Sequence, residues 1–121
     1  AIMSPSVINQ LVVLDSSVEA ASAKITYTDA QQVTYSLDTV AKTAEVTSFS
    51  GSAGADIIIP DVVVSNGQTY AVTSIGTYAF SNTGIHSVII GNNVVDINTS
   101  AFQTTAAYSD YYKNALTEVV L

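Results

Sequence analysis

The sequence predicts a mostly β fold, in which an N-terminal antiparallel β meander leads into a short, irregular solenoid. Three observations support this fold class. Apolar residues alternate with polar ones over residues 23–49, an Asn-Gly pair lies between two β-type runs, and a set of apolar residues recurs in the second half of the chain. We expect a segment of undecided structure over 1–22, a β cap with a hairpin over 23–71, and two repeats over 72–121.

The N-terminal segment fits two structures. Ser4 and Pro5 could form the N-cap and first turn of a helix, and the apolar residues that follow fall near helical spacing. The run from Leu11 to Leu14 also fits a short buried strand. A run this short has no period that separates the two, so helix and strand both stay open.

The cap is expected to contain several short strands. Alternation predicts strands near 24–28, 33–37 and 45–49, with turns at 29–32 and 38–39. Further β-type runs cover 57–59, 62–64 and 69–72. Asn66 and Gly67 separate the last two runs, and both residues accept the positive φ angles of a tight hairpin turn. We therefore expect a hairpin with its tip at Asn66-Gly67.

The repeat is visible as two matching corners, and we call this match the corner repeat. Four apolar residues recur at one constant offset: Val72, Ile75, Ala79 and Phe80 match Val94, Ile97, Ala101 and Phe102. Stacked coils need such a match, because each coil points the same few side chains inward. Gly76 matches Asn98, and both residue types favour the left-handed region, so we expect that conformation there.

A second match follows the corners, and we call it the strand repeat. Residues 85–90 match 116–121, and 56–59 form a degenerate earlier copy at the same offset. This offset is longer than that of the corner repeat. Two insertions account for the difference, namely the Asn66-Gly67 hairpin and the polar, Tyr-rich segment 106–114. We expect these three short strands to stack in parallel as one sheet.

The corner motif, Ile-Gly-x-x-Ala-Phe from Ile75, and the Asn-Thr-Gly-Ile-x-Ser-Val-x-Ile that begins at Asn82 resemble the BspA-type leucine-rich repeat of bacterial surface proteins. In that family a β cap resembling residues 44–70 precedes the first full repeat. The resemblance covers about 33–121 and implies a leucine-rich-repeat-like solenoid and attachment to host, matrix or cell-surface proteins. Gly91 stands where the family usually has Pro, and Asn98 where it usually has Gly.

The composition excludes several classes of partner. The chain has three Lys, no Arg and ten acidic residues, for a formal net charge of −7. Nucleic acids and anionic lipid headgroups both require a cationic surface, so neither is expected to bind. No apolar run is long enough to insert into a membrane. The first residues do not form a signal peptide, and we expect that one was removed from a secreted or cell-surface protein.

No residues are expected to catalyse a reaction or to bind a metal ion or cofactor. His86 is the single histidine, there is no cysteine, and His86 is expected to point outward from a repeat strand. Nothing remains to complete a metal site or a nucleophile–base pair. The carboxylates are scattered, without the spacing of a calcium loop or of the paired acids of a glycosidase. The sequence therefore predicts a protein that is not an enzyme.

Two features are candidates for binding. Tyr108, Tyr111 and Tyr112 cluster in the second insertion, where they either contact a partner or pack over the second repeat. If Ile57, Val88 and Val119 face the core, alternation turns Ile58, Ile89 and Val120 outward as an apolar stripe. Either this stripe is an interface or residues 5–14 lie over it.

These features favour an adhesion or recognition module that binds an extracellular protein. A carbohydrate-binding module that stacks Tyr rings on sugars, and an architectural spacer within a longer surface protein, are the alternatives. Leu121 falls on a repeat strand, and a solenoid normally ends in a capping element. We therefore expect either a piece of a longer protein, which we prefer, or a homo-oligomer formed through the open solenoid end.

Overall fold

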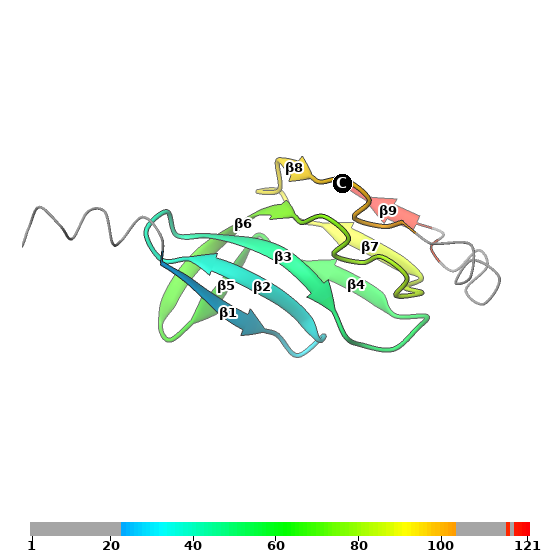
Figure 1. Cartoon of the computed structure of the whole chain (residues 1–121), viewed down its shortest axis with the longest axis horizontal. Coiled ribbons are helices and arrows are strands. Elements are labelled where there is room, and N and C mark those ends of the chain that lie inside the picture. The colour runs from blue at the N-terminus through cyan, green and yellow to red at the C-terminus, as the bar shows by residue number, and fades with distance from the viewer. Residues whose placement is uncertain (1–22, 104–115, 117) are drawn as a thin grey trace, which may run out of the picture.

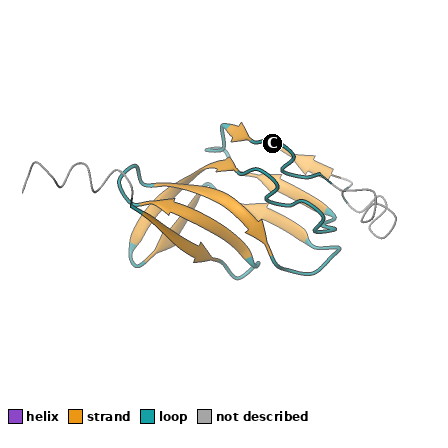
Figure 2. Ribbon diagram, viewed as in Figure 1, coloured by secondary structure: helices purple, strands orange, loops and turns teal. Residues whose placement is uncertain are grey.

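The computed structural model describes residues 23–103, 116 and 118–121, and these residues form strands and loops without a helix (Figures 1 and 2). The strands are β1 (Lys24–Thr28), β2 (Val33–Asp38), β3 (Thr43–Phe49), β4 (Asp56–Ile59), β5 (Val62–Ser65), β6 (Gln68–Ile75), β7 (Ser87–Ile90), β8 (Asp96–Ile97) and β9 (Glu118–Val120). The mostly β fold predicted from the sequence is confirmed.

The cap is an antiparallel meander that continues into the coils. β1, β2 and β3 pair antiparallel in order, and β3 then pairs in parallel with β6. β5 and β6 form the expected hairpin, with Ser65 opposite Gln68. Asn66 and Gly67 have φ angles of 52° and 78°, which is the geometry that made this dipeptide a hairpin signal.

The second sheet consists of the three repeat strands. β4, β7 and β9 are parallel neighbours, and each step between them equals the offset of the strand repeat: Ile57 lies opposite Val88, and Val88 opposite Val119. The corner repeat is also present, because Ile75 of β6 lies opposite Ile97 of β8. Backbone hydrogen bonds join the two corners, including one from the Phe80 amide to the Ala101 carbonyl. Both repeat offsets predicted from the sequence are confirmed.

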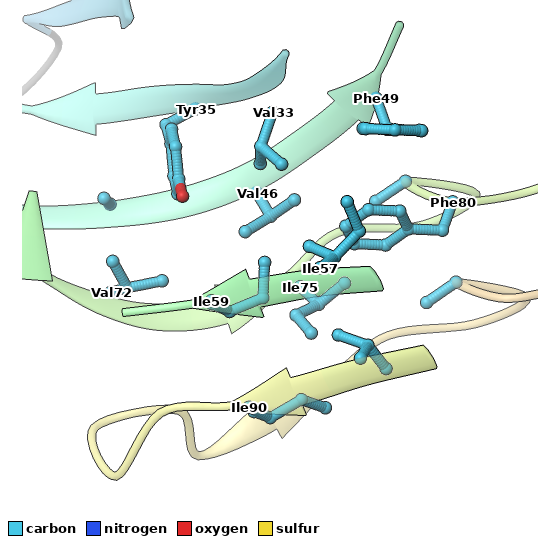
Figure 3. Close-up of a cluster of buried hydrophobic side chains, with 14 of the residues drawn as sticks. Val33, Tyr35, Val46, Phe49, Ile57, Ile59, Val72, Ile75, Phe80 and Ile90 are labelled. Carbon is cyan, nitrogen blue, oxygen red and sulfur yellow. The ribbon is translucent and has the colours of Figure 1, made fainter. Parts of the chain in front are cut away.

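The core lies between the two sheets (Figure 3). Val33, Tyr35 and Val46 of the cap point toward Ile57 and Ile59 of β4, and all five side chains are buried. A column of phenylalanines, one from each level of the coil, closes one end of this core: Phe49, Phe80 and Phe102. Neighbouring rings are 5.9 Å and 5.3 Å apart, and the second pair is stacked. The cap strand β3 therefore acts as the level below the first repeat.

The prediction of a left-handed backbone conformation at Gly76 and Asn98 was wrong. Neither Gly76 nor Asn98 has a positive φ; the left-handed residues are Tyr78 (60°) and Ser100 (58°), two positions further along each corner. Gly76 is required for space instead, because a Cβ there would lie 2.9 Å from the Val46 carbonyl oxygen. That close approach comes from the corner hydrogen bond between the Gly76 amide and the same carbonyl, at 2.7 Å.

Candidate functional site

The outward face of the β4-β7-β9 sheet carries a row of aliphatic side chains. Ile58, Ile89 and Val120 lie opposite one another on the three strands and are 55%, 46% and 40% exposed. Their neighbours on the inward side, Ile57 and Val88, are buried as expected. We call these three outward residues the aliphatic row. Strands in a sheet are about 4.8 Å apart, so the row spans about 10 Å.

Val119, which the sequence predicted to face the core, differs from Ile57 and Val88 in its burial. Val119 shares the register of Ile57 and Val88, yet it is 44% exposed. In the part of the chain that the structure describes, no further level lies over β9 to cover it. The register was predicted correctly, and the burial was not.

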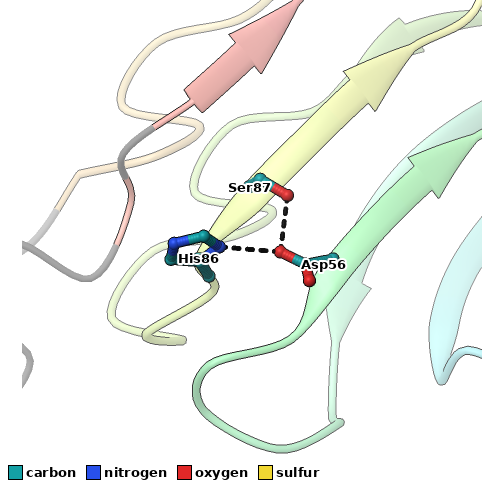
Figure 4. Close-up of polar contacts among 3 residues, drawn as sticks. All are labelled: Asp56, His86 and Ser87. Atoms are coloured by element: carbon teal, nitrogen blue, oxygen red, sulfur yellow. Dashed lines mark hydrogen bonds and ion pairs between the residues drawn. The ribbon is translucent and has the colours of Figure 1, made fainter.

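A polar row lies beside the aliphatic row on the same face. Asp56, Ser87 and Glu118 lie opposite one another on β4, β7 and β9, each two residues before a member of the aliphatic row. The Ser87 hydroxyl donates to Asp56 Oδ1 at 2.6 Å, and His86 Nδ1 lies 2.8 Å from the same oxygen (Figure 4). These contacts, with Ser87 the larger cause, hold the pKa of Asp56 below its usual value. The carboxylate therefore keeps its negative charge at mildly acidic pH.

This Asp-His-Ser cluster differs from a catalytic triad. In a triad the serine hydroxyl donates to the imidazole, and the carboxylate orients the other ring nitrogen. Here the Ser87 hydroxyl donates to the Asp56 carboxylate, and the His86 imidazole contacts the same carboxylate oxygen. The His86 side chain is about half exposed, so its expected position on the surface is confirmed. The cluster therefore adds hydrogen-bonded polar groups beside the aliphatic row.

The described residues contain neither a metal-binding cluster nor a membrane-spanning helix. No three His, Asp or Glu side chains among them gather closely enough to hold a metal ion. Nor does this part of the chain include a helix with the length and apolar character needed to cross a membrane.

Two solved structures resemble this fold. No protein-family model and no curated protein sequence matches the chain. A leucine-rich repeat protein from Bacteroides capillosus ATCC 29799 superposes with a TM-score of 0.61 and 34% identity, over 79% of this chain and 64% of that one. The chain therefore resembles leucine-rich repeat proteins in both sequence and fold. The resemblance inferred from the corner motif and the cap is thereby confirmed.

The second structure is a leucine rich cell surface protein from Faecalibacterium prausnitzii A2-165. It matches this chain with a TM-score of 0.55 and 30% identity, over 67% of this chain and 21% of that one. The chain thus spans less than two thirds of the first related protein and about a fifth of the second. One of the two similar proteins is described as a cell-surface protein.

The structure brings together half of the residues singled out from the sequence. Ile58, Ile89 and Val120 form one row, whereas Tyr108, Tyr111 and Tyr112 lie outside the described residues. Residues 5–14, the alternative cover for the row, also lie outside them.

The sequence analysis missed two contacts of the candidate site. The Asp56–Ser87 contact follows from the register of the strand repeat, so the repeat itself contained a signal for it. The contact of Gln31 with Ile58 had no such signal, because it joins the cap to the coil across 27 residues.

Proposed function

We propose that this chain is a non-catalytic recognition module, secreted or exposed on a bacterial cell surface, that binds an extracellular protein through the outward face of β4, β7 and β9. The observation that carries the proposal is the aliphatic row. Ile58, Ile89 and Val120 project from paired strands in one register, so they form a contiguous apolar surface. Contiguous apolar surface on a soluble protein often marks an interface.

The polar row makes one side of the aliphatic row acidic, which would fix the orientation of a bound partner. Asp56 and Glu118 add negative charge along one side of the aliphatic row, and both are exposed. An interface commonly combines an apolar centre with a polar rim that sets orientation. The two described lysines, Lys24 and Lys42, belong to the cap. A partner with aliphatic or aromatic groups beside a cationic edge would complement this face.

The similar proteins support the cellular setting. The relative from Faecalibacterium is described as a cell-surface protein, and both relatives are leucine-rich repeat proteins. We place this chain in the same setting and propose that a signal peptide directed its export. The strongly negative net charge also argues against nucleic acids and anionic lipids as partners of this chain.

The experiment is a binding screen of the purified chain against extracellular-matrix proteins, bacterial surface proteins and glycans, with Ile89→Asp tested beside the wild type. Ile89 is the centre of the row, and a buried unpaired carboxylate at an interface costs at least about 2 kcal/mol, or roughly thirtyfold in affinity. Val64→Asp is the matched control, because Val64 is 53% exposed but lies on β5 in the other sheet.

The outcomes separate the competing functions. Loss of a protein hit with Ile89→Asp but not with Val64→Asp supports the proposal. Binding of a glycan that is lost in the double variant Tyr111→Ala/Tyr112→Ala, and kept in Ile89→Asp, would replace it with a carbohydrate-binding module. Equal binding by all variants, or no binding to any probe, would favour an architectural spacer.

A further inference from the structure

The outward face of β4, β7 and β9 carries two parallel rows that differ in chemistry. The aliphatic row, Ile58, Ile89 and Val120, is between 40% and 55% exposed. The polar row lies two residues earlier on the same strands, and two of its members, Asp56 and Glu118, are exposed carboxylates. Two residues along a strand cover about 6.6 Å, so one partner element can contact both rows.

The Asp56 carboxylate is held in place on one side and is open on the other. Ser87 and His86 both contact Oδ1, at 2.6 and 2.8 Å (Figure 4). Among the described residues none donates a hydrogen bond to Oδ2, and the side chain is 71% exposed. An oriented, ionised acceptor loses little further freedom when it binds a donor, which favours a cationic group at this point.

The other sheet carries a similar acidic row without an aliphatic one. Glu45, Ser74 and Asp96 lie opposite one another on β3, β6 and β8, in the same order of acid, serine and acid as the polar row. The residues two positions further along the chain are small or polar: Thr47, Gly76 and Asn98. Of these two acidic rows, only the one on β4, β7 and β9 is therefore combined with an apolar row.

The spacing along the aliphatic row selects the shape of a partner that lies across the strands. Adjacent strands are about 4.8 Å apart, so Ile58 and Val120 are about 10 Å apart. In an α-helix, residues i, i+4 and i+7 share one face, and i and i+7 are about 10.5 Å apart along the axis. In an extended segment, residues i, i+2 and i+4 share one face, and the outer two are about 13 Å apart. A helix therefore matches the row better than a strand does.

The polar row specifies a second stripe on such a helix. Position i+1 lies about 100° around the helix from i, and position i+8 lies on the same side as i+1, about 10.5 Å further along the axis. Asp56 and Glu118 are separated by two strand spacings, which is about 10 Å. Lysine or arginine at i+1 and i+8 would lie beside the two carboxylates while apolar side chains at i, i+4 and i+7 cover the aliphatic row.

We propose that the partner of this face is a cationic amphipathic helix of an extracellular protein, which lies across β4, β7 and β9. This choice of partner rests on the proposed function, since the helix would occupy the same face. Charge complementarity supports it, because the polar row is acidic and the two described lysines belong to the cap. Apolar contacts at the centre would supply most of the affinity, and the ion pairs at the rim would fix the orientation.

The test uses a synthetic alanine-based helical peptide of about 15 residues, with leucine at i, i+4 and i+7 and lysine at i+1 and i+8. Fluorescence anisotropy of the labelled peptide, titrated with the full chain at low ionic strength, should show saturable binding. One control peptide has the same composition with its leucines at i, i+2 and i+4, and a second has glutamate in place of both lysines. Each control should bind at least about tenfold more weakly.

Two double variants of the chain test the acidic row. Asp56→Asn/Glu118→Gln should weaken binding of the lysine peptide about threefold to tenfold, because two exposed ion pairs are lost. Glu45→Gln/Asp96→Asn is the matched control, since it removes the same charge from the other sheet, and it should change the affinity less than about twofold. Should Asp56→Asn fail to fold, the single variants Glu118→Gln and Asp96→Asn make the same comparison.

Equal losses in the two double variants would overturn the proposal, because attraction to the negatively charged chain as a whole would then explain the binding. It would also be overturned by a failure of the helical lysine peptide to bind, or by a control peptide that binds as tightly. In each of these cases, a protein partner that is found in the binding screen and lost with Ile89→Asp leaves the proposed function intact. The two failures are therefore distinguishable.

Discussion

The two corners of the repeat carry the same motif but differ in burial. Ile75 is fully buried, whereas its counterpart Ile97, which lies directly opposite it, is 46% exposed. The phenylalanines follow the same trend, because Phe80 is buried and Phe102 is only partly buried. The strands that follow the corners differ in the same way, because Val88 is buried and Val119 is exposed.

The difference comes from the neighbours of each corner. Ile75 lies between Val46 of the cap strand β3 and Ile97 of the second corner, so it is covered on both sides. In the part of the chain that the structure describes, Ile97 has a neighbouring level on one side only. A repeat motif therefore specifies which side chains point inward, and the stacked levels decide how deeply these are buried.

The largest expected effect is on the stability of the first corner. Ile75→Ala should lower the free energy of unfolding by about 3 kcal/mol, because it removes a fully buried side chain and leaves a cavity. Ile97→Ala should lower it by less than about 1 kcal/mol, since much of that side chain already contacts water. Denaturant unfolding followed by circular dichroism measures both values. Equal losses would show that the second corner is covered in solution as fully as the first.

A smaller effect is expected at the glycine of the first corner. Gly76→Ala should cost about 1–3 kcal/mol, because the added Cβ would lie 2.9 Å from the Val46 carbonyl and 3.0 Å from Glu45 Oε2. Asn98→Ala, at the matching position, should cost less than about 0.5 kcal/mol, since Asn98 is exposed and its side chain donates one long bond of 3.4 Å to Glu45.

Gly76→Asn separates the two explanations for this glycine. A left-handed backbone would tolerate asparagine, whereas a shortage of space excludes it at least as strongly as alanine. The same unfolding measurement applies, and a stability for Gly76→Asn equal to that of the wild type would contradict the steric explanation.

The repeat made much of the fold predictable from the sequence. The offsets of the corner repeat and the strand repeat specify which strands stack and in which register, and alternation then gives the outward row Ile58, Ile89 and Val120. The hairpin was predictable for a local reason, since Asn66 and Gly67 both adopt the positive φ angles that few other residues accept. These features depend on periodicity or on single backbone positions, both of which are visible in one sequence.

The contacts that complete the candidate site depend on packing between elements. Gln31 reaches Ile58 only because the cap turn lies against the edge of β4, and no period relates the two residues. The exposure of Val119 could not be predicted from its register, because it depends on whether another level covers β9. The side-chain network of Asp56, His86 and Ser87 required both the register and the rotamers.

The smallest expected effect concerns Tyr78, the left-handed residue of the first corner. Tyr78 has a φ of 60° and is 58% exposed, so it holds an unfavourable backbone conformation with little burial in return. Tyr78→Asn should raise the free energy of unfolding by about 0.5 kcal/mol, because asparagine accepts this region more readily. Tyr78→Ala is the control and should bring no gain, since alanine keeps the same backbone penalty. Thermal unfolding of the three proteins measures the difference, and a less stable Tyr78→Asn would show that contacts of the tyrosine ring outweigh the strain.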